Sequence, residues 1–268
     1  MNSPLRVAII GFGAIGRELV RLLGSCKDEV QITAVLRRSP STAKGYAEGI
    51  KADIWVQSID ALLRGRPELV VECAGHEAVG TYGPSILSTG AELLVASVGA
   101  LADFEVERSL RAAALNSRGR ILIPSGAAGA LDALASARNC GLSTVIYRGT
   151  KSFAAWRGVL PDRLPDAPRT LLFFSGTARE AALRFPRNAN VAAAIALAGL
   201  GFDATQVELI AQEDLVENQH EIFAEGEFGS LKFRVRNRVA ATNPRTSVLT
   251  AGSLAKGVLN RRVVVAFS

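Results

Sequence analysis

The segment that decides the fold lies near the N-terminus and reads Arg6-Val7-Ala8-Ile9-Ile10-Gly11-Phe12-Gly13-Ala14-Ile15-Gly16-Arg17-Glu18-Leu19-Val20. A short apolar run, three glycines spaced as GxGxxG and an apolar-periodic segment predict a strand, a tight turn and a helix. The first glycine permits the turn, the second lets the backbone approach a pyrophosphate, and the third lets helix and strand pack closely. An ordinary turn without a ligand is the alternative. We predict that a dinucleotide binds at this helix N-terminus, through Gly11, Phe12, Gly13, Ala14, Ile15 and Gly16.

Strand and helix patterns alternate through the N-terminal half of the chain. We expect strands at 6–10, 31–36, 54–56, 69–73, 92–96 and 121–123, and helices at 14–23, 41–49, 59–63, 76–89 and 103–117. The helix at 76–89 contains Gly83-Pro84, where we expect an interruption. This alternation is typical of a parallel sheet with right-handed crossovers.

The pattern changes after residue 125. We expect helices at 126–140, 177–185, 190–199 and 246–259, and strands at 144–149, 171–174, 207–211, 219–226, 230–239 and 262–267. Several of these strands alternate apolar and polar residues, as in an antiparallel sheet with one solvated face. The predicted class is therefore α/β, with a Rossmann-type parallel-sheet domain at 1–124 to which 243–268 returns. A smaller α+β substrate domain with a mostly antiparallel sheet is expected at 125–242.

Composition narrows the class of protein. The chain has 268 residues, of which 49% are apolar, and a formal net charge of +6. No apolar run reaches the ~18 residues of a membrane span, and the first strand begins too early to leave room for a signal peptide. We therefore expect a cytoplasmic protein without a membrane partner. The arginines are scattered rather than clustered, so a positive ligand cleft explains the charge better than nucleic-acid binding.

Metal sites and disulfides are not expected. Cys26, Cys73 and Cys140 are widely separated and form no CxxC pair, and His76 and His220 are the only histidines. These spacings fit neither a disulfide framework nor a zinc site. Cys73 follows an apolar run, where it is either near the cofactor or a small buried side chain.

The end of the second strand indicates which nucleotide binds. An acidic residue about 20 positions after the glycine turn normally binds the adenosine ribose 2′-hydroxyl, but here the strand ends in Arg37-Arg38-Ser39. An arginine fork binds a 2′-phosphate that a carboxylate would repel. We therefore favour NADP over NAD. Use of both cofactors, or arginines that merely face solvent, would also fit.

Three later segments have residues suited to a ligand. Small residues at 125–129 follow a strand and let backbone amides approach a ligand, although they also suit close helix packing. Asn188 and Asn190 flank a helix start, where asparagine also serves as a cap. His220 lies in an alternating strand and is the side chain best suited to exchange protons near neutral pH. From the local sequence alone, a structural histidine is the more common case.

Taken in order, these motifs carry a resemblance to a known family. The chain resembles the L-aspartate dehydrogenase family, enzymes of NAD biosynthesis. Besides the glycine turn, the matching segments are Glu72-Cys73-Ala74, Ser97-Val98-Gly99-Ala100-Leu101, Ile123-Pro124-Ser125-Gly126-Ala127, Leu131-Asp132-Ala133-Leu134, Phe185-Pro186-Arg187-Asn188-Ala189-Asn190-Val191-Ala192, His220-Glu221-Ile222, Gly226-Glu227-Phe228-Gly229 and Asn243-Pro244-Arg245-Thr246-Ser247.

The resemblance implies a reversible oxidative deamination of L-aspartate to iminoaspartate, then to oxaloacetate and ammonia. It assigns the catalytic histidine to His220 and cofactor contacts to Ala127 and Asn190. We also expect Cys73 and Ala74, where the strand at 69–73 ends, at the cofactor. The dicarboxylate substrate needs cationic or amide partners, for which Lys151, Asn188 and Arg245 are the candidates. Surface solvation is the alternative for the two cations. Such enzymes are often dimers, so we expect a homodimer.

One departure from the family keeps other functions open. The family usually has Lys-Pro-Pro before a tryptophan, whereas this chain reads Lys151-Ser152-Phe153-Ala154-Ala155-Trp156. The substrate range can therefore differ. Another oxidoreductase of this architecture, such as a semialdehyde or homoserine dehydrogenase or an imine reductase, is one alternative. A sensor that binds NADP without turnover is the other.

Overall fold

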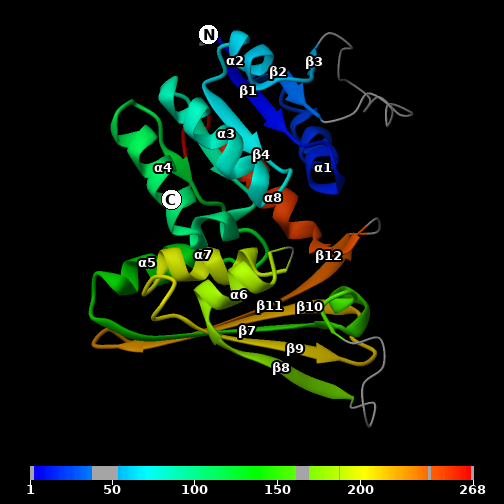
Figure 1. Ribbon diagram of the computed structural model, residues 1–268, viewed down its shortest axis with the longest axis vertical. Helices are drawn as coiled ribbons and strands as arrows, with labels where there is room; N and C mark the ends of the chain where they lie inside the picture. The colour runs from blue at the N-terminus through cyan, green and yellow to red at the C-terminus, as the bar shows by residue number, and fades with distance from the viewer. Residues whose placement is uncertain (1–2, 38–53, 161–168, 187, 241–242, 267–268) are drawn as a thin grey trace. The chain divides into compact units, whose positions relative to one another are not determined.

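The chain forms two compact units in the computed structural model (Figure 1). The first comprises Met1–Ala100, Phe104–Pro124 and Ala251–Ser268, and the second comprises Leu101–Asp103 and Ser125–Thr250. The structure describes residues 3–37, 54–160, 169–186, 188–240 and 243–266.

The first unit contains a six-stranded sheet in which every paired strand is parallel, as predicted. Its order is β3-β2-β1-β4-β5-β6, that of the two mononucleotide-binding halves of a Rossmann fold. The strands are β1 (Leu5–Ile10), β2 (Val30–Leu36), β3 (Trp55–Val56), β4 (Leu69–Glu72), β5 (Glu92–Val95) and β6 (Ile121–Leu122). The helices are α1 (Ala14–Leu23), α2 (Ile59–Arg64), α3 (His76–Ser88), α4 (Phe104–Leu115) and α8 (Val248–Leu259), with a 3-10 helix, η3, at Val98–Ala102.

The core of the first unit draws on both ends of the chain. Val7 and Ile9 of β1 and Leu19 of α1 are completely buried, and they share one apolar cluster with Leu254 of α8. Burying a side chain of this size contributes about 1.5–3 kcal/mol. The C-terminal helix is therefore part of the first unit because it supplies core residues to it.

The second unit contains a mostly antiparallel sheet, also as predicted. Its order is β12-β11-β10-β7-β9-β8, and β7 with β9 is the parallel pair. The strands are β7 (Leu142–Ser152), β8 (Thr170–Thr177), β9 (Gln206–Gln212), β10 (Glu217–Gly226), β11 (Gly229–Ala240) and β12 (Asn243–Ser247). Helices α5 (Leu131–Arg138), α6 (Ala178–Arg184) and α7 (Asn190–Ala198) lie on one side of this sheet (Figure 1), and a 3-10 helix, η4, spans Phe153–Trp156.

Strand β10 shows which face of this sheet is buried. Asn218, His220, Ile222 and Ala224 are buried, whereas the residues between them are partly exposed. Successive strand residues point to opposite faces. The alternation therefore places two polar side chains, Asn218 and His220, in the interior of the second unit.

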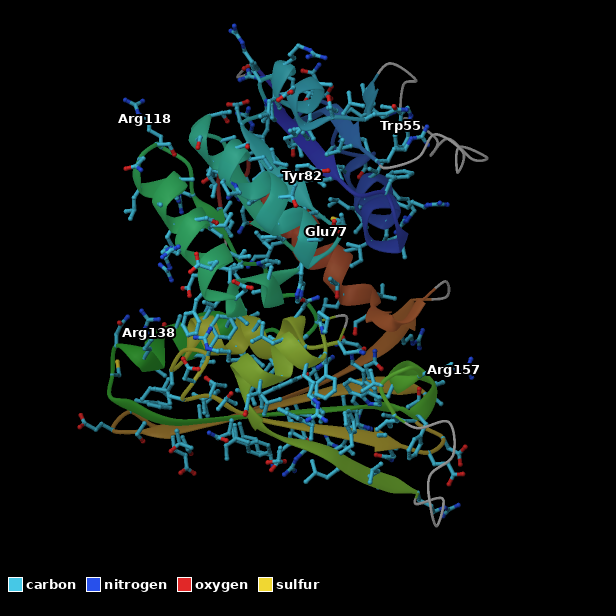
Figure 2. All side chains as sticks on the ribbon, viewed as in Figure 1. Trp55, Glu77, Tyr82, Arg118, Arg138 and Arg157 are labelled. Carbon is cyan, nitrogen blue, oxygen red and sulfur yellow. The ribbon has the colours of Figure 1, made fainter. Side chains whose placement is uncertain are left out.

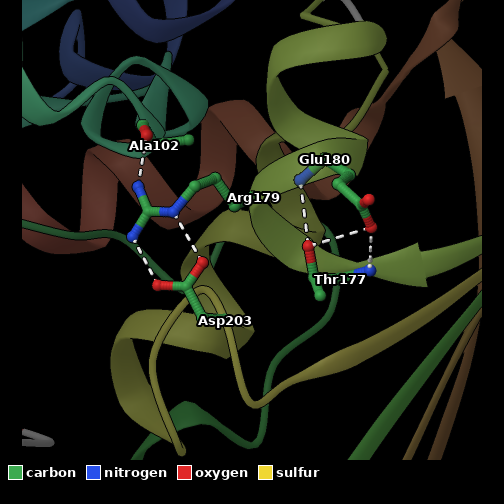
Figure 3. A network of polar contacts seen from close by, with 5 residues as sticks. All are labelled: Ala102, Thr177, Arg179, Glu180 and Asp203. Atoms are coloured by element: carbon green, nitrogen blue, oxygen red, sulfur yellow. Dashed lines mark hydrogen bonds and ion pairs between the residues drawn. The ribbon is translucent and has the colours of Figure 1, made fainter.

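Polar contacts fix the start of α6 (Figure 3). Thr177 and Glu180 form a capping box, in which each side chain accepts a hydrogen bond from the other residue's backbone N–H. Arg179 donates from Nε and Nη2 to the two carboxylate oxygens of Asp203, at 2.7 and 2.8 Å, and from Nη1 to the carbonyl oxygen of Ala102. Ala102 belongs to the second unit, so this contact lies within it.

Four predicted elements were wrong in detail. Helix α3 continues through Pro84, since it packs so closely on α4 that Gly83 leaves no room for a Cβ beside Leu110. The helix expected from 126 begins at Leu131, because Gly126, Gly129 and Ala130 have φ of 60°, 72° and 55°.

The other two errors lie near the C-terminus. Residues 243–247 pair with β11 as β12, so the helix expected from 246 begins at Val248. The final strand is absent from residues 262–266, which pair with no strand there and leave Val264 and Val265 exposed. The helix expected at 41–49 lies outside the described residues.

Candidate functional site

The three glycines of the first turn have different surroundings. Gly11 has φ of +89°, and a Cβ there would lie 2.8 Å from Cα of Ala74. A Cβ on Gly16 would lie 2.5 Å from the carbonyl oxygen of Gly11. A Cβ on Gly13 would meet no described atom within 4 Å. The fold therefore requires the first and third glycines, whereas the second faces open space, as a residue at a ligand does.

The N-terminus of α1 suits an anion. Its N-cap is Gly13, which makes no side-chain cap hydrogen bond, and its first turn has no acidic residue. The first amides of a helix have no partners within it, and the helix dipole adds partial positive charge. Phe12, Ala14 and Ile15 belong to this same turn and helix start. These residues fit a dinucleotide pyrophosphate.

The turn after β4 lies beside the glycine turn. Strands β1 and β4 are neighbours, and the backbone N–H of Cys73 donates to the carbonyl oxygen of Ile10 at 2.7 Å. This is where the strand order reverses, the place at which open α/β sheets bind ligands. Cys73 and Ala74 therefore follow the carboxyl end of β4 beside the glycine turn, and their contact with a cofactor stays a prediction. Burial, helped by the charge of Glu72, raises the pKa of the Cys73 thiol, which keeps it protonated.

Arg37 lies directly after β2, where the ribose-recognising residue is expected. Its guanidinium carbon is 4.5 Å from the centroid of the Trp55 ring, which itself makes an edge contact with Phe12 at 4.8 Å between centroids. Figure 2 shows Trp55 on β3, at the edge of the first sheet. This cation–π contact orients the guanidinium. Arg38 and Ser39 lie outside the described residues.

His220 is a buried titratable group of the second unit whose pKa departs strongly from its ordinary value. It is 1% exposed, and its Nδ1 lies 2.7 Å from the hydroxyl oxygen of Tyr147. Its Nε2 is buried and has no hydrogen-bond partner in the described structure. Burial, with a smaller contribution from the charge of Lys151, lowers the pKa of His220 to about 3. The imidazole is therefore neutral at pH 7, with one ring nitrogen held by Tyr147.

The register of two strands creates this arrangement. His220 in β10 pairs directly with Gly149 in β7. A Cβ on Gly149 would lie 2.6 Å from the Tyr147 hydroxyl oxygen, so glycine leaves the room that this hydroxyl occupies. Burial raises the pKa of the Tyr147 phenol. The hydroxyl therefore keeps its proton and can donate to the imidazole.

Two of the predicted substrate residues lie together in this interior. Lys151 is 4% exposed, and its Nζ donates to the carbonyl oxygen of Asn188 at 3.4 Å. Nζ also lies 5.2 Å from the centroid of the Trp156 ring. Asn188 is 8% exposed, and its Oδ1 is buried without a hydrogen-bond partner. Because the charge of Lys151 also acts on His220, these three residues form one buried polar cluster.

The remaining predicted residues lie on other elements of the second unit. Ala127 is buried, and its carbonyl oxygen accepts a 2.6 Å hydrogen bond from Nδ2 of Asn237 on β11. Asn190 is the first residue of α7. Arg245 belongs by its backbone to β12, and its side chain lies outside the described part of the structure.

Sequence reasoning missed Tyr147, Gly149 and Asn237. A signal exists for the first two: Tyr147, Gly149 and Lys151 stand at alternate positions and therefore share one strand face. Their meaning depends on β10 pairing beside them, which no local pattern shows. Asn237 lies 110 residues from its partner.

Two absences concern the described residues only. No group of three or more His, Cys, Asp or Glu side chains there is placed to hold a metal ion. Among the helices that the structure describes, none is long and apolar enough to cross a membrane.

Comparison with known proteins shows which family the chain resembles over nearly its whole length. A family described as aspartate dehydrogenase, C-terminal, matches residues 132–261, and one described as the homoserine dehydrogenase NAD binding domain matches residues 11–124. L-aspartate dehydrogenase 1 of Bordetella parapertussis is 44% identical over 97% of both chains. The chain belongs to the L-aspartate dehydrogenase family.

Other relatives and solved structures are also similar to this chain over nearly its whole length. L-aspartate dehydrogenase of Pseudomonas aeruginosa is 40% identical over 96% of this chain and 97% of its own. The crystal structure of aspartate dehydrogenase from Thermotoga maritima has a TM-score of 0.76 and 27% identity, covering 98% of this chain and 99% of that one. An archaeal homoserine dehydrogenase in complex with NADPH shares the fold at 11% identity and a TM-score of 0.62.

Proposed function

We propose that the protein catalyses the NAD(P)-dependent oxidative deamination of L-aspartate. The observation that carries this proposal is the 44% identity to an L-aspartate dehydrogenase over 97% of both chains. The buried cluster of Lys151, Asn188 and His220 supports it, because a small dicarboxylate needs cationic and amide partners. The product iminoaspartate then reacts with water to give oxaloacetate and ammonia. The oxidative deamination of aspartate can feed NAD biosynthesis.

In this proposal the first unit binds the dinucleotide. Residues 11–16 and the α1 amides hold the pyrophosphate, Cys73 and Ala74 border it, and Ala127 and Asn190 of the second unit add contacts. The bound cofactor supplies a hydride acceptor for the Cα hydrogen of aspartate. The protein contributes orientation, which accounts for much of the rate when two carbons must be aligned.

The second unit binds the substrate and handles protons. Lys151, Asn188 and Arg245 are the proposed partners of the two carboxylates. His220 is the proposed catalytic residue, which takes a proton from the amine or activates the attacking water through Nε2.

We propose that substrate binding shifts the pKa of His220. A pKa of about 3 makes the imidazole a weak base in the free protein. Two substrate carboxylates nearby offset the charge of Lys151, and negative charge raises the pKa of an imidazole. Binding of aspartate should therefore raise the pKa of His220 by offsetting the charge of Lys151, while burial continues to lower it.

The test of this function is a substrate panel. NADPH or NADH formation is followed with L-aspartate, with other L-amino acids, and with homoserine and aspartate semialdehyde. Turnover with aspartate well above the others is expected. Preference for homoserine or a semialdehyde, or tight NADPH binding with no turnover on any of them, contradicts the proposal.

Cofactor preference has its own test. We propose NADP as the preferred cofactor, since Arg37 stands where an acid would bind a free 2′-hydroxyl. Replacing Arg37 by serine removes a phosphate partner and should reduce the preference for NADPH over NADH by about tenfold. Dissociation constants for both nucleotides measure this. Unchanged selectivity assigns the preference elsewhere.

Assembly and location are also proposed. The outer face of the second sheet carries exposed Leu172 and partly exposed Phe223 among charged residues. A second copy of the chain can cover this face across a two-fold axis, giving a homodimer in the cytoplasm. Light scattering coupled to gel filtration measures the mass, and a monomer at micromolar concentration contradicts this assembly.

A further inference from the structure

Glu72 is a completely buried carboxylate that the proposed reaction does not use. It is the last residue of β4 and is 0% exposed. Its Oε1 accepts hydrogen bonds from the backbone N–H groups of Ala74 and Gly75, at 2.6 and 2.7 Å, and from Oγ of Ser97 at 3.0 Å. Its Oε2 accepts from the backbone N–H of Ser97 at 2.9 Å. One side chain thus satisfies donors from two separate turns.

These two turns lie at the edge that binds the dinucleotide. Ala74 and Gly75 connect β4 to α3, and Ser97 connects β5 to η3. Both turns leave the carboxyl ends of neighbouring parallel strands, β4 and β5. Ala74 is also the residue whose backbone closes on Gly11. The position of Ala74 against the glycine turn therefore depends on the carboxylate that holds its amide.

The buried surroundings of Glu72 disfavour the charged form of its carboxyl group. Burial raises the pKa of its carboxyl, and the four donated hydrogen bonds oppose that rise. In the described residues it forms no ion pair, so N–H and O–H dipoles alone meet its charge. A buried carboxylate is tolerated only where donors surround it. An amide in its place would turn an N–H toward at least one of these donors.

We propose that Glu72 is a positioning residue of the dinucleotide site, which holds the turns at Ala74 and Ser97 in the conformation that binds the cofactor. The inference rests on the proposed function, because it concerns the affinity of the same site. Glu72 acts through the two turns that it ties together.

The test compares Glu72→Gln with the unmodified protein without substrate. NADPH affinity is measured by fluorescence titration well below the thermal transition of each variant. Glu72→Gln should weaken NADPH binding by about tenfold or more. In the nucleotide-free protein, hydrogen exchange at the amides of residues 74, 75 and 97 should become faster. The KM for aspartate at saturating cofactor should change little.

A matched control separates positioning from general stability. Ser117 lies in the turn before β6, at the amino ends of the strands of the same sheet. Its Oγ donates to the carbonyl oxygen of Leu87 at 2.7 Å and accepts from the N–H of Gly119 at 2.9 Å. Ser117→Ala should lower Tm and leave NADPH affinity unchanged. If Glu72→Gln does not fold, Ser97→Ala removes one of the four bonds and should weaken binding by about two- to threefold.

The outcomes distinguish this inference from the proposed function. Failure of the unmodified protein to bind either NADPH or NADH overturns both. Normal NADPH affinity in Glu72→Gln, or in Ser97→Ala where the first variant is unfolded, overturns the positioning role alone. Equal weakening by Ser117→Ala does so as well, because it would show that any loss of stability reduces binding.

Discussion

The glycine turn of the first unit and the histidine cluster of the second unit are built in opposite ways. Six consecutive residues, Gly11 to Gly16, form the turn and the start of α1, in which Gly11 has a positive φ and Gly16 leaves no room for a Cβ. The cluster joins Tyr147 to His220, 73 residues apart, and Lys151 to Asn188, 37 residues apart. The local sequence therefore specifies a binding turn made of backbone, whereas a cluster made of side chains depends on strand register.

The two regions also differ in burial, and therefore in what a substitution does. Gly13 meets no described atom within 4 Å, so a small side chain there changes ligand binding more than folding. His220 and Lys151 are nearly inaccessible, so their charges and hydrogen bonds affect stability as well as chemistry. Four predictions test this contrast.

The largest effect is expected in the cluster, for His220→Asn. Loss of a general acid–base group lowers kcat by about 10²- to 10⁴-fold, whereas the NADPH dissociation constant should stay unchanged. Steady-state kinetics and fluorescence titration measure the two. Gln219→Ala, next along β10 but on the opposite face, is the control and should keep its turnover. Full activity in His220→Asn would remove the catalytic assignment.

The pH dependence of stability should also arise in the cluster. The pKa of His220 is about 3 in the folded chain, against an ordinary value of 6.5. Between these values the unfolded chain binds a proton that the folded chain does not. The neutral imidazole therefore contributes roughly 3–5 kcal/mol to the free energy of unfolding above pH 6.5, and this contribution is lost as the pH falls toward 3. Urea denaturation across this range should show a shallower loss for His220→Asn than for the unmodified protein. Parallel curves would contradict the burial of an uncharged imidazole.

A pair of glycine variants tests the turn. Gly13→Ala places a methyl group in open space, so we expect NADPH binding to weaken about 10- to 100-fold, with stability lowered by at most about 1 kcal/mol. Gly16→Ala forces a Cβ to 2.5 Å from the Gly11 carbonyl oxygen and should lower stability more, by about 1–3 kcal/mol. Thermal denaturation with and without NADPH distinguishes loss of stability from loss of NADPH binding in each variant. The reverse order of stabilities would refute the different roles of these glycines.

The smallest effect is expected from the partner of the histidine. Tyr147→Phe removes one hydrogen bond to Nδ1 and should reduce kcat by about tenfold. Gly149→Ala displaces the same hydroxyl, so the double variant should be little worse than either single one. Gly252→Ala, where a Cβ meets no described atom within 4 Å, serves as the control. Additive losses in the double variant would show that Tyr147 and Gly149 act separately.

Several elements were predictable because their signals are local. Helix α1 has the predicted bounds, and the strands of the first sheet are apolar runs bounded by turns. The errors occurred where a distant contact overrode a local preference. Pro84 continues a helix because α4 packs against α3, and residues 243–247 form a strand because β11 offers a pairing edge. Propensity is a weak guide wherever tertiary contacts decide.

In the candidate site too, local sequence signals could be recognised and distant contacts could not. The glycine turn and Arg37 follow from their position after a strand, whereas His220 was assigned by the family resemblance, since the local sequence favoured a structural histidine. Glu72 gave no sign of its role, since a carboxylate at the end of an apolar strand shows its purpose only when the donors of two turns surround it.

By itself the amino-acid sequence determined the class of fold, the dinucleotide turn and the family, because periodicity, glycine spacing and ordered motifs are properties of the chain. Only the tertiary structure decided that Tyr147 holds the imidazole of His220, that burial and the charge of Lys151 lower its pKa, and that Glu72 ties two turns together. The physical reason is that hydrogen bonding and desolvation depend on distance in space, and strand pairing brings together residues that lie far apart along the chain.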